Sequence, residues 1–132
     1  MHAKDYPGFK KRTVDNWHNQ AKRARKYGKE LEFSLDDLRA FVAGALSRPC
    51  CYCATELTVK NFGIDHSEPV SRSKDFSLSN LSVTCEGCNR AKGDMNDREF
   101  TELLNLMAKW PIEIRKNTIA RLRAGAGGRF GR

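Results

Sequence analysis

Four of the five cysteines fall into two matched pairs, and this spacing predicts a metal site. Cys50 and Cys53 are separated by two residues, and so are Cys85 and Cys88. Two intervening residues allow a turn to place both sulfurs on one ion, at ~2.3 Å from it for zinc. Four thiolates would complete a tetrahedral shell and leave no position for water, so this zinc would be structural. Cys51 is assigned no metal role, because only one residue separates it from Cys53.

A second group of polar residues lies between and just after the cysteine pairs. Asp65 and His66 are adjacent, Asn80 precedes an apolar stretch, and Asn89 directly follows Cys88. An imidazole can exchange protons near neutral pH, and carboxylate and amide oxygens suit Mg²⁺ or Mn²⁺ better than zinc. Each residue also has a purely structural explanation: a strand end, a turn, or hydrogen bonding to nearby backbone. Because successive strand residues point to opposite faces, Asp65 and His66 can share one site only if the strand ends or bends there.

The elements that must position these residues follow from periodicity and capping signals. Residues Ile64–His66 and Leu81–Thr84 are short strand candidates, and a helix from Glu86 to about Lys92 would carry Asn89. Strand, loop, strand and helix in this order would bring Asp65, His66 and Asn89 together. Four further helices are expected, over residues 13–27, about 34–46, from 96 and 111–123. The second would begin at the N-cap Ser34, with Asp37 three residues on, and the third at a capping box of Asn96 and Glu99. An extended piece is expected at 32–33, and Trp17 and Trp110 are expected in the core.

Charge is distributed unevenly along the 132 residues, whose formal net charge is +8. Residues 1–30 hold nine Lys and Arg against three acids, and residues 108–132 hold seven against one. The middle, 31–107, holds eight against twelve. Basic ends around a mildly acidic centre indicate contact with a polyanion such as nucleic acid, although two solvated helix faces would give the same counts.

The length suits one domain, and no apolar run is long enough to span a bilayer or to resemble a signal peptide. We therefore expect a protein of the reducing cytoplasm without a membrane partner. In that compartment, cysteines serve metal binding or catalysis rather than disulfides.

The segment from Cys50 to about Asp94 resembles the HNH endonucleases, whose active site is a ββα-metal fold. The resemblance rests on the four cysteines together with DHSEPVSRS, the Asn80-Leu81 pair and CEGCNRAKGD, in this order. The preceding stretch AKRARKYGKELEFSLDDLRAF is similar to the N-terminal flank of some phage-type members, which act inside a bacterial host cell. One departure is that the last signature residue of the family is often His, whereas this chain has Asn89.

The resemblance implies a role for each polar residue. His66 would be the general base that takes a proton from the attacking water, while Asp65 and the side-chain oxygen of Asn89 would hold one Mg²⁺ or Mn²⁺. Asn80 would orient His66 or brace the loop. Products of this family carry a 5′-phosphate and a 3′-hydroxyl. Basic residues near the site and on the first helix would contact the DNA backbone, although solvated charge explains them almost as well: Arg72, Arg90, Lys92, Lys22, Arg23 and Lys26.

The sequence therefore predicts a single α+β domain over residues 1–123. It would comprise a basic N-terminal helical arm at 1–33, a zinc-stapled ββα-metal core at about 50–94, C-terminal helices at 96–123 and a flexible tail at 124–132. The expected function is metal-dependent hydrolysis of phosphodiester bonds in double-stranded DNA, with little or no sequence specificity. A monomer with one site would nick one strand at a time unless it dimerises. The alternatives are a non-catalytic four-cysteine zinc module that binds nucleic acid, and an RNA-cleaving member of the same fold.

Overall fold

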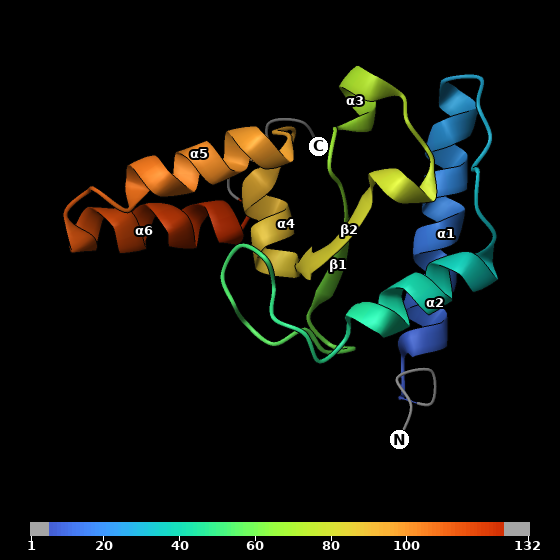
Figure 1. Cartoon of the computed structure of the whole chain (residues 1–132), viewed down its shortest axis with the longest axis horizontal. Helices are drawn as coiled ribbons and strands as arrows, with labels where there is room; N and C mark the ends of the chain where they lie inside the picture. The colour runs from blue at the N-terminus through green and yellow to red at the C-terminus, as the bar shows by residue number, and fades with distance from the viewer. Residues whose placement is uncertain (1–5, 126–132) are drawn as a thin grey trace.

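A two-stranded antiparallel sheet followed directly by a helix forms the centre of the molecule (Figure 1). We describe residues 6–125 of a computed structural model; the expected arm and tail extend beyond these bounds at 1–5 and 126–132. The elements are α1 (Phe9–Lys26), α2 (Leu35–Ala45), β1 (Phe62–His66), α3 (Val70–Ser73), the 3-10 helix η2 (Leu78–Asn80), β2 (Leu81–Cys85), α4 (Glu86–Lys92), α5 (Asp97–Met107) and α6 (Ile112–Arg123). The predicted mixture of helices with a small ββα unit is confirmed.

The two strands pair in a register that runs from Phe62 opposite Cys85 to His66 opposite Leu81. Both predicted strands are present and are slightly longer than expected. The helix α4 begins at the residue after β2 and packs against both strands, so strand ends and helix are held in one rigid unit. This unit fixes where His66 and Asn89 lie.

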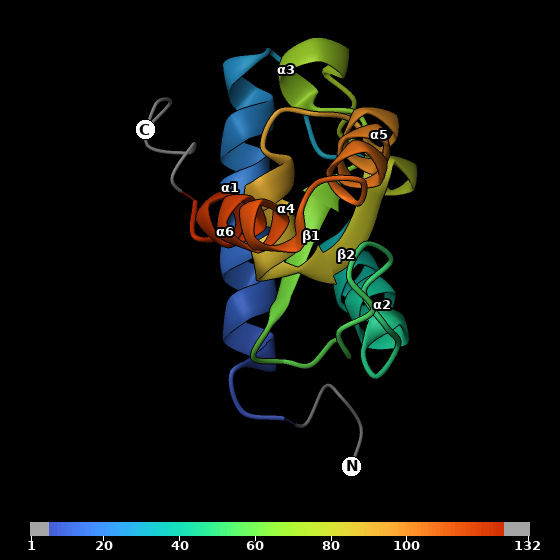
Figure 2. The same ribbon diagram turned by 90° about the vertical axis from the view of Figure 1, so that its left-hand side faces the viewer.

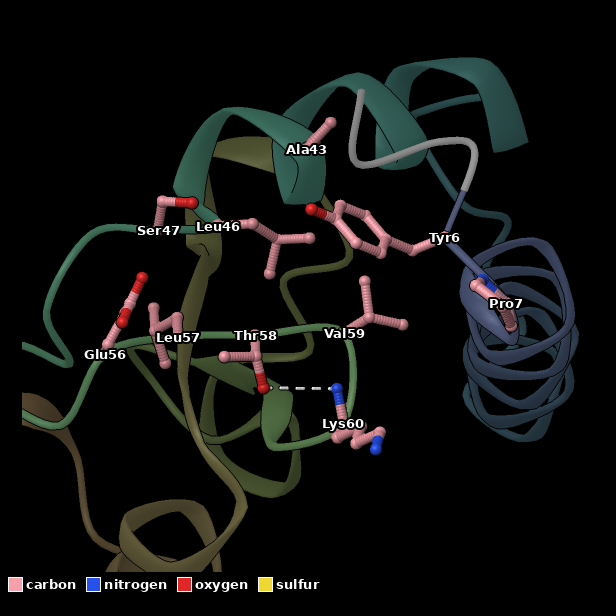
Figure 3. A pocket seen from close by; sticks show the side chains of 10 residues that line it. All are labelled: Tyr6, Pro7, Ala43, Leu46, Ser47, Glu56, Leu57, Thr58, Val59 and Lys60. Atoms are coloured by element: carbon pink, nitrogen blue, oxygen red, sulfur yellow. Dashed lines mark hydrogen bonds between the residues drawn. The ribbon is translucent and has the colours of Figure 1, made fainter. Parts of the chain in front are cut away.

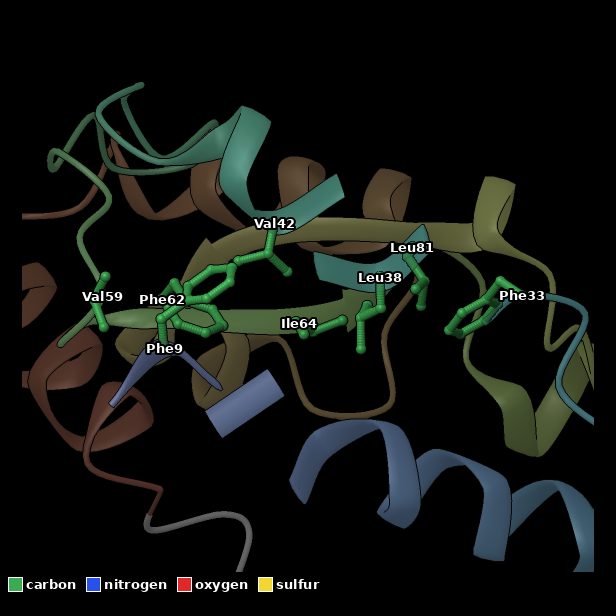
Figure 4. Close-up of a cluster of buried hydrophobic side chains, with 8 residues drawn as sticks. All are labelled: Phe9, Phe33, Leu38, Val42, Val59, Phe62, Ile64 and Leu81. Atoms are coloured by element: carbon green, nitrogen blue, oxygen red, sulfur yellow. The ribbon is translucent and has the colours of Figure 1, made fainter. Parts of the chain in front are cut away.

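The main hydrophobic core lies between the sheet and the helices α1 and α2 (Figure 4). Val42 and Leu38 of α2 and Phe9 of α1 are fully buried against side chains of the strands. Its buried members are Phe9, Phe33, Leu38, Val42, Val59, Phe62, Ile64 and Leu81. The basic first helix is therefore part of the fold, because its Phe9 is buried in this core and its Trp17 packs against it.

Arg12 attaches α1 to the ββα unit by polar contacts as well. Its Nη2 donates to the carbonyl of Phe62 at 2.6 Å and to the Glu86 carboxylate at 2.7 Å. The guanidinium also lies 4.2 Å from the centre of the Phe62 ring, within the range of a cation–π contact. These contacts join residues more than 40 positions apart, so α1 has a defined position beside the sheet (Figure 2).

Capping signals located two helix starts correctly. The Ser34 hydroxyl accepts the amide of Asp37, whose carboxylate accepts the amide of Ser34, at 3.0 Å each. Asn96 and Glu99 form the same reciprocal pair at the start of α5. Such boxes satisfy amides that have no partner within the helix.

Four expectations at element ends and in the core need correction. The helix α1 begins at Phe9 rather than residue 13, because the chain turns at Gly8 with φ of +86°. Phe33 is not in a strand; its side chain enters the core from a bend. Pro111 lies just before α6 instead of in its first turn. Trp110 is 39% exposed, so it is not a core residue.

Among residues 6–125, no helix combines the length and the apolar character needed to cross a membrane.

Candidate active site and metal centre

The four paired cysteines converge on one point. Their Sγ atoms all lie within 4.8 Å of one another, and those of Cys53 and Cys85 are 3.6 Å apart. Four sulfurs at ~2.3 Å from a tetrahedral zinc would be ~3.8 Å apart, which is close to this arrangement. The cluster also lies in a second core that contains Leu57, Ala91 and Phe100. A structural zinc therefore fits, and Cys51 is exposed outside the cluster as expected.

Backbone amides and a hydroxyl support the sulfurs. The amide of Cys85 donates to Cys50 Sγ at 3.4 Å, and the amide of Cys88 donates to Cys85 Sγ at 3.3 Å. Burial would raise the pKa of Cys53, but hydrogen bonds with Thr55, Arg123 and Cys85 together outweigh it and lower that pKa to about 6. Burial raises the pKa of Cys88. Coordination to a cation would keep all four as thiolates.

The residues predicted to carry the chemistry meet at a separate cavity of about 210 Å³. Asp65 and His66 come from the end of β1, and Asn89 comes from α4. The strand ends at His66, so both members of the Asp-His pair reach the same cavity. Another part of the wall comes from α1.

Asp65 is held by a buried lysine. The Lys92 side chain is 1% exposed, and its Nζ lies 2.8 Å from Asp65 Oδ2 and 3.3 Å from Asp97 Oδ1. The same Nζ donates to the carbonyl of His66 at 2.8 Å. Lys92 is thus oriented toward the protein interior, and its expected role as a DNA contact is wrong. The ammonium group of Lys92 instead holds the Asp65 carboxylate and the end of β1 in position beside the cavity.

The Asp65 carboxylate still has unused bonding capacity. Its contact with Lys92 is an ion pair, and Oδ2 has no partner in hydrogen-bond geometry within the described part of the chain. Burial raises the pKa of Asp65, and Lys92 offsets only part of this effect. A buried carboxylate of this kind is suited to a cation.

His66 has a buried ring nitrogen without a partner. Its Nε2 forms no hydrogen bond with any residue in 6–125. Burial lowers the pKa of His66 to about 4, and the positive charges of Arg23 and Lys92 act in the same direction. The imidazole is therefore neutral at pH 7 and can accept a proton from a group in the cavity.

Asn89 lies close to β1 because residue 63 is a glycine. A Cβ at Gly63 would be 3.1 Å from Asn89 Nδ2, tighter than most contacts of real side chains. Asn89 Nδ2 lies 3.5 Å from the Ile64 carbonyl, a long contact that orients the amide toward the strand. Its oxygen is left for a ligand.

Asn80 braces the loop and does not line the cavity. Its Oδ1 accepts the amide of Glu68 at 2.9 Å, while Nδ2 donates to the carbonyls of Glu68 at 2.9 Å and Asp75 at 3.1 Å. The backbone carbonyl of Asn80 accepts the amide of Ser67, the residue after His66, at 2.8 Å. Of the two roles expected for Asn80, these contacts correspond to bracing the loop.

A divalent cation fits beside Asp65 and Asn89 with few protein ligands. Within residues 6–125, the four cysteines are the only group of three or more His, Cys, Asp or Glu side chains arranged to hold a metal. Asp65 and Asn89 therefore offer one carboxylate and one amide oxygen, both hard ligands, and the carboxylate of Asp94 and the amides of α1 also line this cavity. Mg²⁺ is commonly bound in this way, with waters and substrate phosphate completing its shell.

The α1 wall of the cavity was not predicted as a unit. Its residues Asn16, Asn19, Gln20 and Arg23 follow the i, i+3, i+4, i+7 spacing of one helix face. The signal in the sequence was this spacing, which places three amides and a guanidinium on one face of the helix. Arg23 is the one expected DNA contact that lines the cavity, whereas Lys22 and Lys26 are exposed on the same helix.

The other two arginines predicted near the site are engaged with acids at the surface. Arg72 Nη1 lies 2.6 Å from Glu99. Arg90 Nη1 lies 3.8 Å from Glu86, and its Nε donates to the carbonyl of Arg123 at 2.7 Å. Both side chains stay about half exposed, so they remain available to a phosphate.

A larger, more apolar hollow of about 570 Å³ lies elsewhere, between α2 and the segment 56–60 (Figure 3). Leu46, Leu57 and Val59 point into it, with Tyr6 closing one side. It contains none of the residues predicted to carry the chemistry, so we assign the site to the smaller polar cavity.

Comparison with known proteins agrees with this geometry. Residues 50–105 match the family model described as HNH endonuclease. No curated protein and no solved structure matched the chain. The matched segment contains the cysteine cluster, the ββα unit and the three cavity residues Asp65, His66 and Asn89. This segment, residues 50–105, is therefore similar to the HNH endonucleases.

Proposed function

We propose that the protein is a metal-dependent endonuclease that hydrolyses phosphodiester bonds in double-stranded DNA. The family match supports a nuclease-type function. The observation that carries the proposal is the neutral His66, whose buried Nε2 lacks a partner, beside the carboxylate of Asp65 and the amide of Asn89 in one cavity.

His66 would act as the general base. Its neutral ring takes a proton from a water in the cavity, and the oxygen of that water forms a bond to the phosphorus. The bond from phosphorus to the 3′ oxygen breaks, and the departing oxygen gains a proton from solvent. The products would then be a 5′-phosphate and a 3′-hydroxyl. Asn80 would serve this step by bracing the loop that follows His66.

Asp65 and Asn89 would hold one Mg²⁺ or Mn²⁺. When bound, this cation supplies positive charge that stabilises the transition state and the leaving oxygen. Lys92 keeps the Asp65 carboxylate in place for that role through the 2.8 Å ion pair. The zinc at the four cysteines would have no part in the chemistry, because its shell is full.

The basic helix α1 would hold the DNA backbone over the cavity. Arg23 would contact the scissile phosphate, since it lines the same cavity as Asp65. Lys22 and Lys26 are exposed beside it, and Arg72 and Arg90 lie on other elements at the surface. Such contacts position a duplex without reading its sequence, so cleavage would be weakly specific. A monomer would nick one strand per encounter.

Cleavage of supercoiled plasmid tests the proposal. Wild type and His66→Ala are incubated with Mg²⁺, Mn²⁺ or EDTA, and DNA binding is measured in parallel by gel shift. His18→Ala is the matched control, because His18 is exposed on α1 away from the cavity. We expect open circles from wild type and His18→Ala with metal, and none from His66→Ala, which still binds DNA.

Other outcomes separate the alternatives. Equal cleavage by His66→Ala would indicate a contaminating nuclease and refute the assignment of the base. Binding without cleavage under any metal would favour a non-catalytic zinc module. Cleavage of RNA but not of plasmid would move the proposal to an RNA substrate. Early linear product would indicate paired cuts by two copies.

A further inference from the structure

The last helix is held to the molecule with little burial of its own. None of the residues of α6 is buried. It packs against α4, the helix that carries Cys88, as both views show (Figures 1 and 2). Its residue Leu122 packs against the second core but is only partly buried. A helix with so little buried surface needs a further source of attachment, because isolated helices of about 12 residues are marginal in water.

Arg123, the last residue of α6, reaches the cysteine cluster. Its Nη1 lies 3.8 Å from Cys88 Sγ, and its Nη2 lies 3.8 Å from Cys85 Sγ. These are distances at which N–H groups donate to sulfur. The two nitrogens of one guanidinium thus contact the two sulfurs of one cysteine pair.

The chain leaves space for this guanidinium at Gly87, between the two cysteines. A Cβ on residue 87 would lie 2.8 Å from both Nε and Nη2 of Arg123. The carbonyl of Arg123 also accepts a hydrogen bond from Arg90 Nε at 2.7 Å. The side chain and the backbone of Arg123 are therefore both bound to α4.

The charge of a zinc-loaded cluster complements this contact. A divalent ion with four thiolates carries a formal charge of about −2. The guanidinium is permanently cationic, and hydrogen bonds between charged groups are stronger than neutral ones. We propose that Arg123 binds the zinc–thiolate centre from outside its coordination shell, so that zinc fixes α6 in place and Arg123 in turn slows the loss of zinc. This inference requires zinc in the cluster but does not require nuclease activity.

The first test is the rate of zinc release to an excess of a coloured chelator. Arg123→Gln removes the charge, and Gly87→Ala displaces the guanidinium while leaving Arg123 in the sequence. Arg121→Gln is the matched control, since Arg121 is exposed on the same helix. We expect release to accelerate at least tenfold in the first two variants and to be unchanged in the control. The double variant should release zinc no faster than the faster single variant, because both changes remove one contact.

The second test is cleavage of α6 by trypsin, followed by mass spectrometry of cuts after Arg115 and Lys116. We expect wild type to resist with zinc and to be cut within α6 after chelation. Arg123→Gln should be cut readily even with zinc bound. Circular dichroism of each variant shows that the remainder of the protein is folded.

Metal content makes the outcomes distinct. If all variants hold one zinc per chain and match wild type in release rate and in trypsin cleavage, the inference about Arg123 is overturned while the zinc site stands. If wild type purifies without zinc and takes none up, the zinc assignment fails and the inference with it. Neither result depends on the proposed cleavage of DNA.

Discussion

Replacing Lys92 by methionine should destabilise the protein severely, although lysine is a residue that usually lies at the surface. Methionine preserves the length of the side chain and removes its charge. Lys92 is 1% exposed, and it contacts Asp65 at 2.8 Å and the carbonyl of His66 at 2.8 Å. Asp65 would remain buried without its counter-charge.

The expected loss follows from these contacts. Removing one partner of a buried ion pair costs about 3–5 kcal/mol, because the other charge stays behind in a poorly solvated position. The third contact, with Asp97, adds little because that carboxylate is 47% exposed. We expect a loss near the lower end, about 3 kcal/mol, since Asp65 can take up a proton and become neutral.

Urea denaturation at pH 7, followed by circular dichroism, measures this loss. Lys22→Met is the matched control, because Lys22 is exposed on α1, and it should change the free energy of unfolding by less than about 0.5 kcal/mol. Combining Lys92→Met with Asp65→Asn should restore part of the stability, since no buried charge is then left unpaired. The penalty should also shrink toward pH 4, because burial raises the pKa of Asp65 and a protonated carboxyl needs no counter-charge. A loss below about 1 kcal/mol for Lys92→Met, with no recovery in the double variant, would refute the reasoning.

Three further predictions concern the cavity. Burial lowers the pKa of His66 to about 4, so this base is unprotonated above that pH. The value of kcat/KM for plasmid nicking should therefore still be near its plateau at pH 6. A fall in kcat/KM centred at pH 6.5 or higher would contradict this. Asn80→Ala removes three hydrogen bonds to the loop and should lower the free energy of unfolding, measured by urea denaturation, by about 2–3 kcal/mol. Nicking should also be slower under conditions where the variant stays folded. A variant as stable as wild type would show that other contacts hold the loop. Gly63→Ala places a methyl group 3.1 Å from Asn89 Nδ2. The Mn²⁺ affinity measured by calorimetry should fall at least tenfold, with little effect on folding. An unchanged Mn²⁺ affinity would exclude Asn89 as a ligand in this position.

Local signals explain what could be predicted from the sequence. The capping box at Ser34 and Asp37 is formed by residues three apart, and the cysteine spacing is a property of single turns. Hydrophobic stretches bounded by turn residues located both strands. The meeting of Asp65, His66 and Asn89 then followed from the order strand, loop, strand and helix.

Contacts between distant segments explain what could not. From its neighbours in the sequence, Lys92 would be predicted to be a solvent-exposed charge. Its buried partner, the Asp65 carboxylate, is evident only once α4 is packed against β1. The wall of amides on α1 required knowledge of where that helix packs. Trp110 is exposed because it lies in the turn between α5 and α6, a hairpin that extends away from the core (Figure 1).

The wall that α1 contributes to the cavity has an evolutionary consequence. This helix, Phe9–Lys26, lies wholly outside the segment 50–105 that matches the family. The groups that would handle protons and metal are thus encoded in one part of the gene, and four of the twelve residues that line the cavity are encoded in another. Under the proposed function, substitutions at Asn16, Asn19, Gln20 or Arg23 would alter which nucleic acid is admitted while the segment 50–105 keeps its sequence. Substrate preference and chemistry can therefore diverge separately in proteins built on this plan.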